Sequence, residues 1–197
     1  MKFALPIKAV TNAQKCQAKD DARYYLNGFH VTSNTVEASN GHFLYQAKIK
    51  QFEYPSYICD MNINNQPPET MIIKMKQQIR QPLKKLGCEF VVFEVVDSKV
   101  IATTIDHYGS DIAVYLGEVV DGEFPDVKKR AIPYGEPEQH KQVSFNADYL
   151  KMLSSVTGYT GHVKLQSYGE HKASVFTIID HVNMHFDAIF VLMPIRL

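Results

Sequence analysis

Residues 190–197 read Phe-Val-Leu-Met-Pro-Ile-Arg-Leu, a largely apolar stretch. Its hydrophobic run predicts a buried last strand, and Pro194 predicts where backbone pairing ends, because proline has no N–H to donate. Ile195 and Leu197 then follow around a single charge, Arg196. Such a tail, returning to the surface, offers half-exposed apolar groups to a partner. A core strand with no further role is the alternative.

The composition indicates a globular chain with enough apolar residues for a core, because 45% of its 197 residues are hydrophobic. Lys and Arg number 21, and so do Asp and Glu, so contact with nucleic acid requires local segregation of charge. Cys16, Cys59 and Cys88 lack metal-type spacing and fit free thiols in a reducing compartment. Without a secretory signal or membrane-length apolar segment, we expect a cytoplasmic protein.

A short apolar strand that runs into a helix occurs three times, at 3–10, 71–79 and 143–153. The spacing of roughly 70 residues is typical of a repeated supersecondary unit. The pattern predicts helices over 6–18, over about 75–86, and from an N-cap at Asn146 with Asp148 in the first turn. Pro82 should kink the second of these helices.

Strands separated by turn residues are predicted after each helix. They cover 24–32, 34–49 with a break at Asn40 and Gly41, 57–63, 90–96, 99–105, 112–119, 162–168, 173–179 and 186–193. Each unit is therefore strand, helix and about three antiparallel strands, an α+β fold with its helices on one face of the sheets. The polar stretch 134–140 is the predicted linker, which separates two units from a third.

Positive charge is predicted to gather on two helix faces. On the first, Lys8, Asn12, Lys15 and Lys19 share one face, with no acid before Asp20. The second has a similar acid-free run, made of Lys74, Lys76, Arg80, Lys84 and Lys85. One such stripe is more often a solvated helix face, but two in equivalent positions favour a surface that meets DNA phosphates irrespective of base sequence.

Catalysis is not indicated by any motif. The sequence has no nucleophile-elbow, phosphate-loop or zinc-protease pattern. His181 and His185 share a strand face but would lie about 13 Å apart, too far for one metal. Asp106 and Asp111 flank a turn and are better explained as turn formers. We expect no enzyme activity, no metal and no cofactor.

Four further motifs occur in a fixed order: Arg-Tyr-Tyr-Leu-Asn-Gly at 23–28, Ala-Ser-Asn-Gly-His-Phe-Leu at 38–44, Asp-Gly-Glu-Phe-Pro-Asp at 121–126 and Met-Pro-Ile-Arg-Leu at 193–197. In this order they resemble the bacterial sliding clamp, the β subunit of the replicative DNA polymerase. Residues 1–138 resemble the complete middle domain of that family. Residues 139–197 resemble only the second half of its last domain.

The resemblance implies a DNA-clamp fold and a role in DNA replication as a polymerase processivity factor, with helices lining a ring around duplex DNA. It implies that Arg23, Tyr24 and Tyr25 form a DNA-facing loop. It also implies a pocket for short peptides of polymerases and the clamp loader. That pocket would comprise Leu26, Ser39, Gly41, His42, Leu44, Pro125, Val191, Leu192, Met193, Pro194, Ile195, Arg196 and Leu197.

The sequence departs from the family pattern at two places. Phe43 stands where the family usually has arginine, and Lys128, Lys129 and Arg130 replace a more usual Arg-Arg-aliphatic run. These departures bear on which peptide is preferred.

Two assemblies remain open on the sequence. Three half-domain units leave one unpaired, so two chains could complete a domain across a twofold interface. A tetramer is then favoured, because four chains would supply the units of a six-domain ring. The alternative is a clamp-like protein that forms no ring, but binds clamp partners or a full-length clamp and modulates replication.

Overall fold

The computed structural model describes residues 1–51, 53–59, 61, 63, 67–82, 86–126, 133, 135–137, 143–157, 161–169, 172–179 and 185–194. In this part of the chain the strands form one 11-stranded antiparallel sheet in the order β1-β6-β7-β8-β5-β2-β3-β4-β11-β10-β9. The strands are β1 (Lys2–Pro6), β2 (Phe29–Thr32), β3 (Thr35–Ser39), β4 (Phe43–Ile49), β5 (Thr70–Met75), β6 (Phe90–Val96), β7 (Lys99–Ile105), β8 (Asp111–Val120), β9 (His162–Gln166), β10 (Ser174–Ile179) and β11 (Phe186–Leu192).

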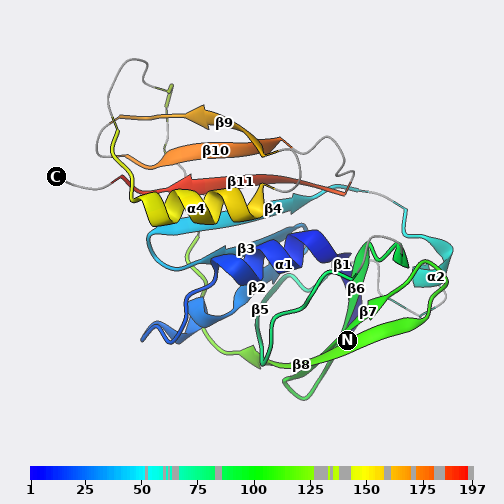
Figure 1. Cartoon of the computed structure of the whole chain (residues 1–197). Helices are drawn as coiled ribbons and strands as arrows, with labels where there is room; N and C mark the ends of the chain where they lie inside the picture. The colour runs from blue at the N-terminus through cyan, green and yellow to red at the C-terminus, as the bar shows by residue number, and fades with distance from the viewer. Residues whose placement is uncertain are drawn as a thin grey trace.

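The two longer described helices cover the same face of this sheet. Helix α1 (Ile7–Cys16) and helix α4 (Ala147–Val156) lie side by side, with α1 against β3 and β4 and α4 next to β11 (Figure 1). Two short turns, η1 (Tyr24–Asn27) and α2 (Ser56–Cys59), complete the helical elements of the described chain. The predicted α+β fold, with helices on one face of the sheet, is confirmed.

The starts of both long helices follow from local sequence. Pro6 precedes α1, where its fixed φ suits a helix start and its missing N–H costs nothing. Asn146 caps α4, because its side-chain oxygen accepts a hydrogen bond from the Asp148 N–H at 2.8 Å, and this predicted N-cap is confirmed.

Strand alternation divides the apolar side chains between the two faces of the sheet. The face under the helices carries the main core, where Phe3 stacks on Phe93 with ring centroids 5.3 Å apart. In β4, Phe43 and Tyr45 point into this core, whereas Leu44 between them points to the other face. Burial on both faces accounts for the long apolar runs in β6 and β11.

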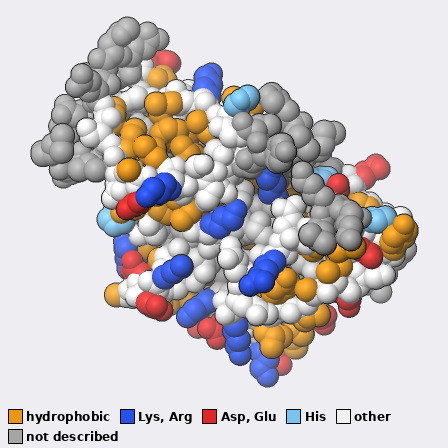
Figure 2. Space-filling model, in the orientation of Figure 1, with side chains coloured by type: hydrophobic (Ala, Val, Ile, Leu, Met, Phe, Trp, Pro, Cys, Tyr) orange, Lys and Arg blue, Asp and Glu red, His pale blue; other side chains and the backbone are white. Residues whose placement is uncertain are grey.

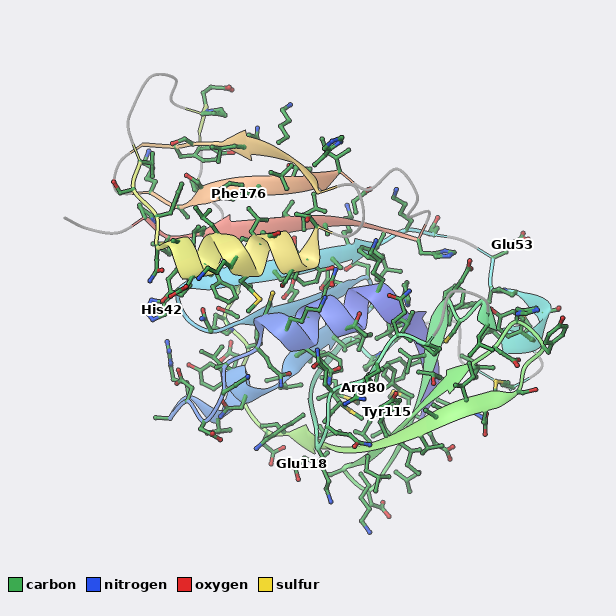
Figure 3. The ribbon with its side chains drawn as sticks, viewed as in Figure 1. His42, Glu53, Arg80, Tyr115, Glu118 and Phe176 are labelled. Atoms are coloured by element: carbon green, nitrogen blue, oxygen red, sulfur yellow. The ribbon has the colours of Figure 1, made fainter. Side chains whose placement is uncertain are left out.

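The second predicted helix, over about 75–86, is wrong where the structure describes it. Residues 76–82 form no helix. The Ile79 N–H donates instead to Gln14 Oε1 at 2.9 Å, and the Arg80 N–H donates to Tyr115 Oη at 3.3 Å. Figure 3 shows Arg80 and Tyr115 next to one another below α1. Tertiary partners thus replace helical hydrogen bonds, and Pro82 cannot donate one.

Two predicted strand segments are also helical turns. In 24–27, where a strand was expected, the Leu26 N–H donates to the Arg23 carbonyl at 2.8 Å, and the strand begins only at Phe29. In the described part of 57–63, the Ile58 N–H donates to the Pro55 carbonyl at 2.9 Å, which closes a turn that Pro55 starts. Of the predicted linker, 135–137 are described and lie in no helix or strand.

Candidate functional site

A groove of about 480 Å³ lies on the helix face, between α1, the segment after β5 and the end of α4. It brings together three of the predicted DNA-contacting residues, Lys15, Lys19 and Lys76. Its full lining is Gln14, Lys15, Gln17, Lys19, Met75, Lys76, Gln77, Gln78, Met152 and Ser155. These lining residues include no acid, and their lysine and amide groups are the donors that proteins offer to phosphate oxygens. We call this the basic groove.

Lysine and arginine side chains lie across the middle of the helix face. Figure 2 shows them spread over the surface that α1 and α4 cover. Asp and Glu side chains also lie on this face, so positive and negative charge are only partly separated there.

Part of the first predicted stripe holds the two helices together. Lys15 Nζ donates to the Ser155 carbonyl at 2.9 Å and to Asn12 Oδ1 at 3.2 Å. Asn12 Nδ2 donates to the Val156 carbonyl at 3.0 Å. These contacts satisfy carbonyls that the end of α4 leaves open, and burial of the Lys15 ammonium lowers its pKa.

The two ends of that stripe have different surroundings. Lys8 is half-buried and lines a small cavity of about 20 Å³ with Asn12 and Asp187 among its walls. Lys19 lies past the end of α1, so the helical spacing does not position it, although it still reaches the basic groove.

The second predicted stripe is divided between the two faces of the sheet. Ile73 and Met75 point into the helix-side core, so Lys74 between them points to the opposite face, where its register partner is Glu118. Lys76 lines the basic groove and Arg80 is exposed nearby on the same segment. Lys84 lies outside the described residues. Of these predicted DNA-contacting residues, Lys76 therefore lines the basic groove, whereas Lys74 lies on the opposite face of the sheet.

An apolar cluster occupies the sheet face opposite the helices, and we call it the outer cluster. Leu44 of β4 and Val191 of β11 are direct register partners in it, and Leu26 of η1 packs with them at 2% exposure. These were three of the predicted pocket walls. The other buried members are Ala18, Ile72, Phe124, Tyr168, Ala173 and Val175, with Tyr25, Val120 and Ile189 packed against them.

The turn between β3 and β4 forms a rim beside this cluster. Ser39 Oγ donates to the Phe43 carbonyl at 2.7 Å and accepts from the Gly41 N–H at 3.0 Å. Gly41 has φ +89°, and a Cβ there would lie 2.6 Å from the guanidinium of Arg23. Because glycine has no Cβ, the guanidinium of Arg23 can lie directly over the backbone of Gly41.

Arg23 forms a forked pair with Asp21. Its Nε donates to Asp21 Oδ1 at 2.9 Å and its Nη2 donates to Asp21 Oδ2 at 2.8 Å. This hydrogen bonding lowers the pKa of Asp21 to about 2 and raises the pKa of Arg23. Tyr24 is 56% exposed and its ring lies edge-on to Tyr25, which packs on the outer cluster. The predicted DNA-facing loop therefore lies beside the outer cluster, not among the residues that line the basic groove.

The chain leaves β11 next to the same rim. The Met193 N–H donates to the His42 carbonyl at 3.2 Å, and the Met193 side chain is 45% exposed. His42, labelled in Figure 3 near the start of α4, stacks on Tyr149 with centroids 5.4 Å apart. Pro125 and Pro194 are half-buried.

Some predicted pocket residues do not reach the outer cluster. Leu192 is fully buried in the helix-side core, because it alternates with Val191. Phe43 points the same way and stacks on Phe190 at 5.0 Å. Ile195, Arg196 and Leu197 lie outside the described residues, as do Lys128, Lys129 and Arg130.

Several residues that sequence reasoning missed belong to these two sites. Tyr168, Val175 and Ile189 belong to the outer cluster, and Val175 is the register partner of Val191. Alternation along the predicted strands 173–179 and 186–193 could have identified Val175 and Ile189. The glutamines of the basic groove, at positions 14, 17, 77 and 78, had no such signal, because their segments meet only in the folded chain.

No group of three or more His, Cys, Asp or Glu side chains that could hold a metal ion occurs in the described chain. No described helix has the length and apolar character needed to cross a bilayer.

Comparison with known proteins identifies the fold. No protein-family model and no curated protein matches the sequence. Among solved structures, the DNA polymerase sliding clamp of Pseudomonas aeruginosa is similar over 100% of this chain and 66% of its own, with a TM-score of 0.61 and 18% identity. The DnaN sliding clamp of Bartonella birtlesii, bound to griselimycin, has a TM-score of 0.59 and 18% identity. The DNA polymerase III β subunit of Thermotoga maritima has a TM-score of 0.57 and 16% identity.

The match is one of fold over about two thirds of a longer protein. This chain spans 66% of the length of each of these three structures. The chain thus has the sliding-clamp fold over the part of the clamp that it spans. The three structures are named as DNA polymerase sliding clamps or as the β subunit of DNA polymerase III.

Proposed function

We propose that this chain is a DNA sliding clamp, a processivity factor that surrounds duplex DNA as a homo-oligomeric ring and tethers a DNA polymerase. The observation that carries the proposal is the basic groove, which gathers Lys15, Lys19 and Lys76 on the helix face of a clamp fold. Contacts of this kind bind phosphates irrespective of the base sequence, as a protein that slides along DNA requires.

The domain organisation expected from sequence is part of this proposal. Residues 1–138 form a complete clamp domain and residues 139–197 form half of another. Pairing of β4 with β11, over seven residue pairs from Phe186↔Ile49 to Leu192↔Phe43, supports a rigid junction between the two parts. One unpaired half-domain per chain favours a ring of four chains, in which pairs of half-domains complete the missing domains.

The outer cluster and the tail after β11 form the docking site for polymerase and clamp-loader peptides. Leu26, Leu44 and Val191 supply its apolar floor, and the exposed Met193 lies at its edge. The forked Arg23–Asp21 pair adds charge to the rim above Gly41. Apolar anchors in a well-packed site carry most of the affinity for short peptides.

Sedimentation velocity at micromolar concentration tests the assembly. The proposal expects an oligomer whose mass is four times that of the 22.4 kDa chain. A strict monomer that nevertheless binds clamp-binding peptides would contradict the ring. That result would favour the alternative, a non-ring clamp-like protein that competes for clamp partners or binds a full-length clamp.

A further inference from the structure

The third unit leaves apolar positions exposed that the first two units bury. Leu165, the fourth residue of β9, is 52% exposed, whereas Phe93, the fourth residue of β6, is 0% exposed. Leu165 faces the helix side, because its register partner Phe176 lies in the helix-side core. Figure 3 shows Phe176 on β10, above α4 in this view.

The helix of the third unit shows the same difference. Counted from the N-cap residues Pro6 and Asn146, Val10 of α1 and Leu150 of α4 occupy equivalent positions. Val10 is 0% exposed and Leu150 is 39% exposed. The side of α4 that faces away from α1 therefore lacks the cover that α1 has.

Within residues 1–126, that cover comes from an exchange of strands between units. The strand before α1, β1, pairs with β6 of the second unit, and β5 of the second unit pairs with β2 of the first. In the first of these ladders Phe3 lies opposite Phe93, and Leu5 lies opposite Val91. The first strand of each unit thus pairs with a strand of the other unit.

In the third unit, neither the segment before the helix nor the edge of the first strand after it has such a partner among the described strands. Residues 143–145, just before the α4 N-cap, belong to no described strand, although the sequence predicts a strand there. Strand β9 ends the described sheet and pairs only with β10 in it. An unpaired strand edge with exposed apolar side chains is a template for a strand of another chain.

We propose that a second copy of this chain covers the third unit by exchanging this strand. Residues 143–145 of each copy pair antiparallel with β9 of the other, about a twofold axis, as β1 pairs with β6. The equivalent register places Val143 opposite the partner's Leu165, and Phe145 opposite the partner's Val163. The two α4 helices then meet through Leu150. This inference rests on the proposed function and specifies the interface between chains.

Disulfide cross-linking tests the register directly. In a Cys59→Ser background, Val143→Cys with Leu165→Cys should form a covalent dimer under mild oxidation, because opposite residues in a ladder lie about 4.5–5.5 Å apart. The matched control, Val143→Cys with Lys164→Cys, places the second thiol on the other face and should stay monomeric on a denaturing gel. Absence of the dimer in the first variant, or equal dimer in both, overturns the proposed register.

A second variant measures the same interface without oxidation. Leu165→Glu should weaken chain association at least about tenfold in sedimentation equilibrium, because it buries a charge. Val96→Glu, at a residue that is 54% exposed on β6, should leave association unchanged. An unchanged association for Leu165→Glu overturns the interface.

The outcomes separate this inference from the proposed ring. If the wild-type chain forms a tetramer but the Val143→Cys, Leu165→Cys variant does not cross-link, strand exchange is contradicted and the ring is left intact. A specific cross-linked dimer that never exceeds twice the chain mass supports strand exchange and contradicts the four-chain ring.

Discussion

Lys15 of α1 lies with its Nζ 2.9 Å from the backbone oxygen of Ser155, so a side chain of one helix caps the end of the other. A lysine placed there stabilises the negative end of the α4 dipole. The same residue lines the basic groove. Its charge therefore has a structural use besides any contact with DNA.

We expect Lys15→Gln to lower the free energy of unfolding by about 1 kcal/mol, because it removes a charged donor from the end of α4. Urea denaturation followed by circular dichroism would measure the change. Lys19→Gln is the control, since Lys19 is exposed and lies past the end of α1. Equal stability of the two variants would argue against the capping role.

Lys74 and Lys76 lie on different faces of the sheet, so their replacement should affect DNA binding differently. Lys76→Glu should weaken retention on DNA and reduce the slope of log affinity against log salt by about 1, because Lys76 lines the basic groove. Lys74→Glu should change neither, because Lys74 lies on the other face next to Glu118. Fluorescence anisotropy with duplex DNA at several salt concentrations tests both. Equal loss in the two variants would contradict the assignment of faces.

For the outer cluster, we expect Met193→Ala to reduce affinity for a clamp-binding peptide at least about tenfold, since an exposed apolar anchor is removed. Deletion of Arg196 and Leu197 tests the rest of the tail in the same titration calorimetry experiment. Tyr108→Ala is a suitable control, because Tyr108 is 80% exposed in the β7–β8 turn, outside the cluster. Normal peptide affinity after both changes would contradict the pocket.

Titration of Asp21 should report its pair with Arg23. The folded-state pKa of about 2 lies below the ordinary value of about 3.9. The pair therefore stabilises the folded loop above about pH 4, and that stabilisation is lost as the pH falls toward 2. In Arg23→Ala the carboxyl should titrate near its ordinary pKa, as followed by NMR. A low pKa that persists in this variant would show that Arg23 is not the cause.

Local rules predicted much of the fold. Alternation and turn residues placed strands 90–96 and 99–105, and the sequence alone identified the Asn146 cap. The fold class follows from these elements, because strand, helix and strands in repeated order favour helices on one side of an antiparallel sheet.

Long-range contacts account for the failures. Residues 76–82 have a helical pattern of apolar positions, but Gln14 and Tyr115 capture their backbone N–H groups, and the sequence gives no sign of this. The DNA-binding set was therefore divided, because a strand sends Lys74 to the face opposite the main core. In the tail, the resemblance grouped Val191 with Leu192, although strand alternation sends them to different faces.

The most direct test of a ring around DNA is retention on closed circular duplex before and after the circle is cut. At moderate salt, with duplex ends unblocked, the wild-type chain should stay with the circle during gel filtration and should leave once the DNA is linearised. Equal retention on circular and linear DNA would contradict encirclement, and so would release from both.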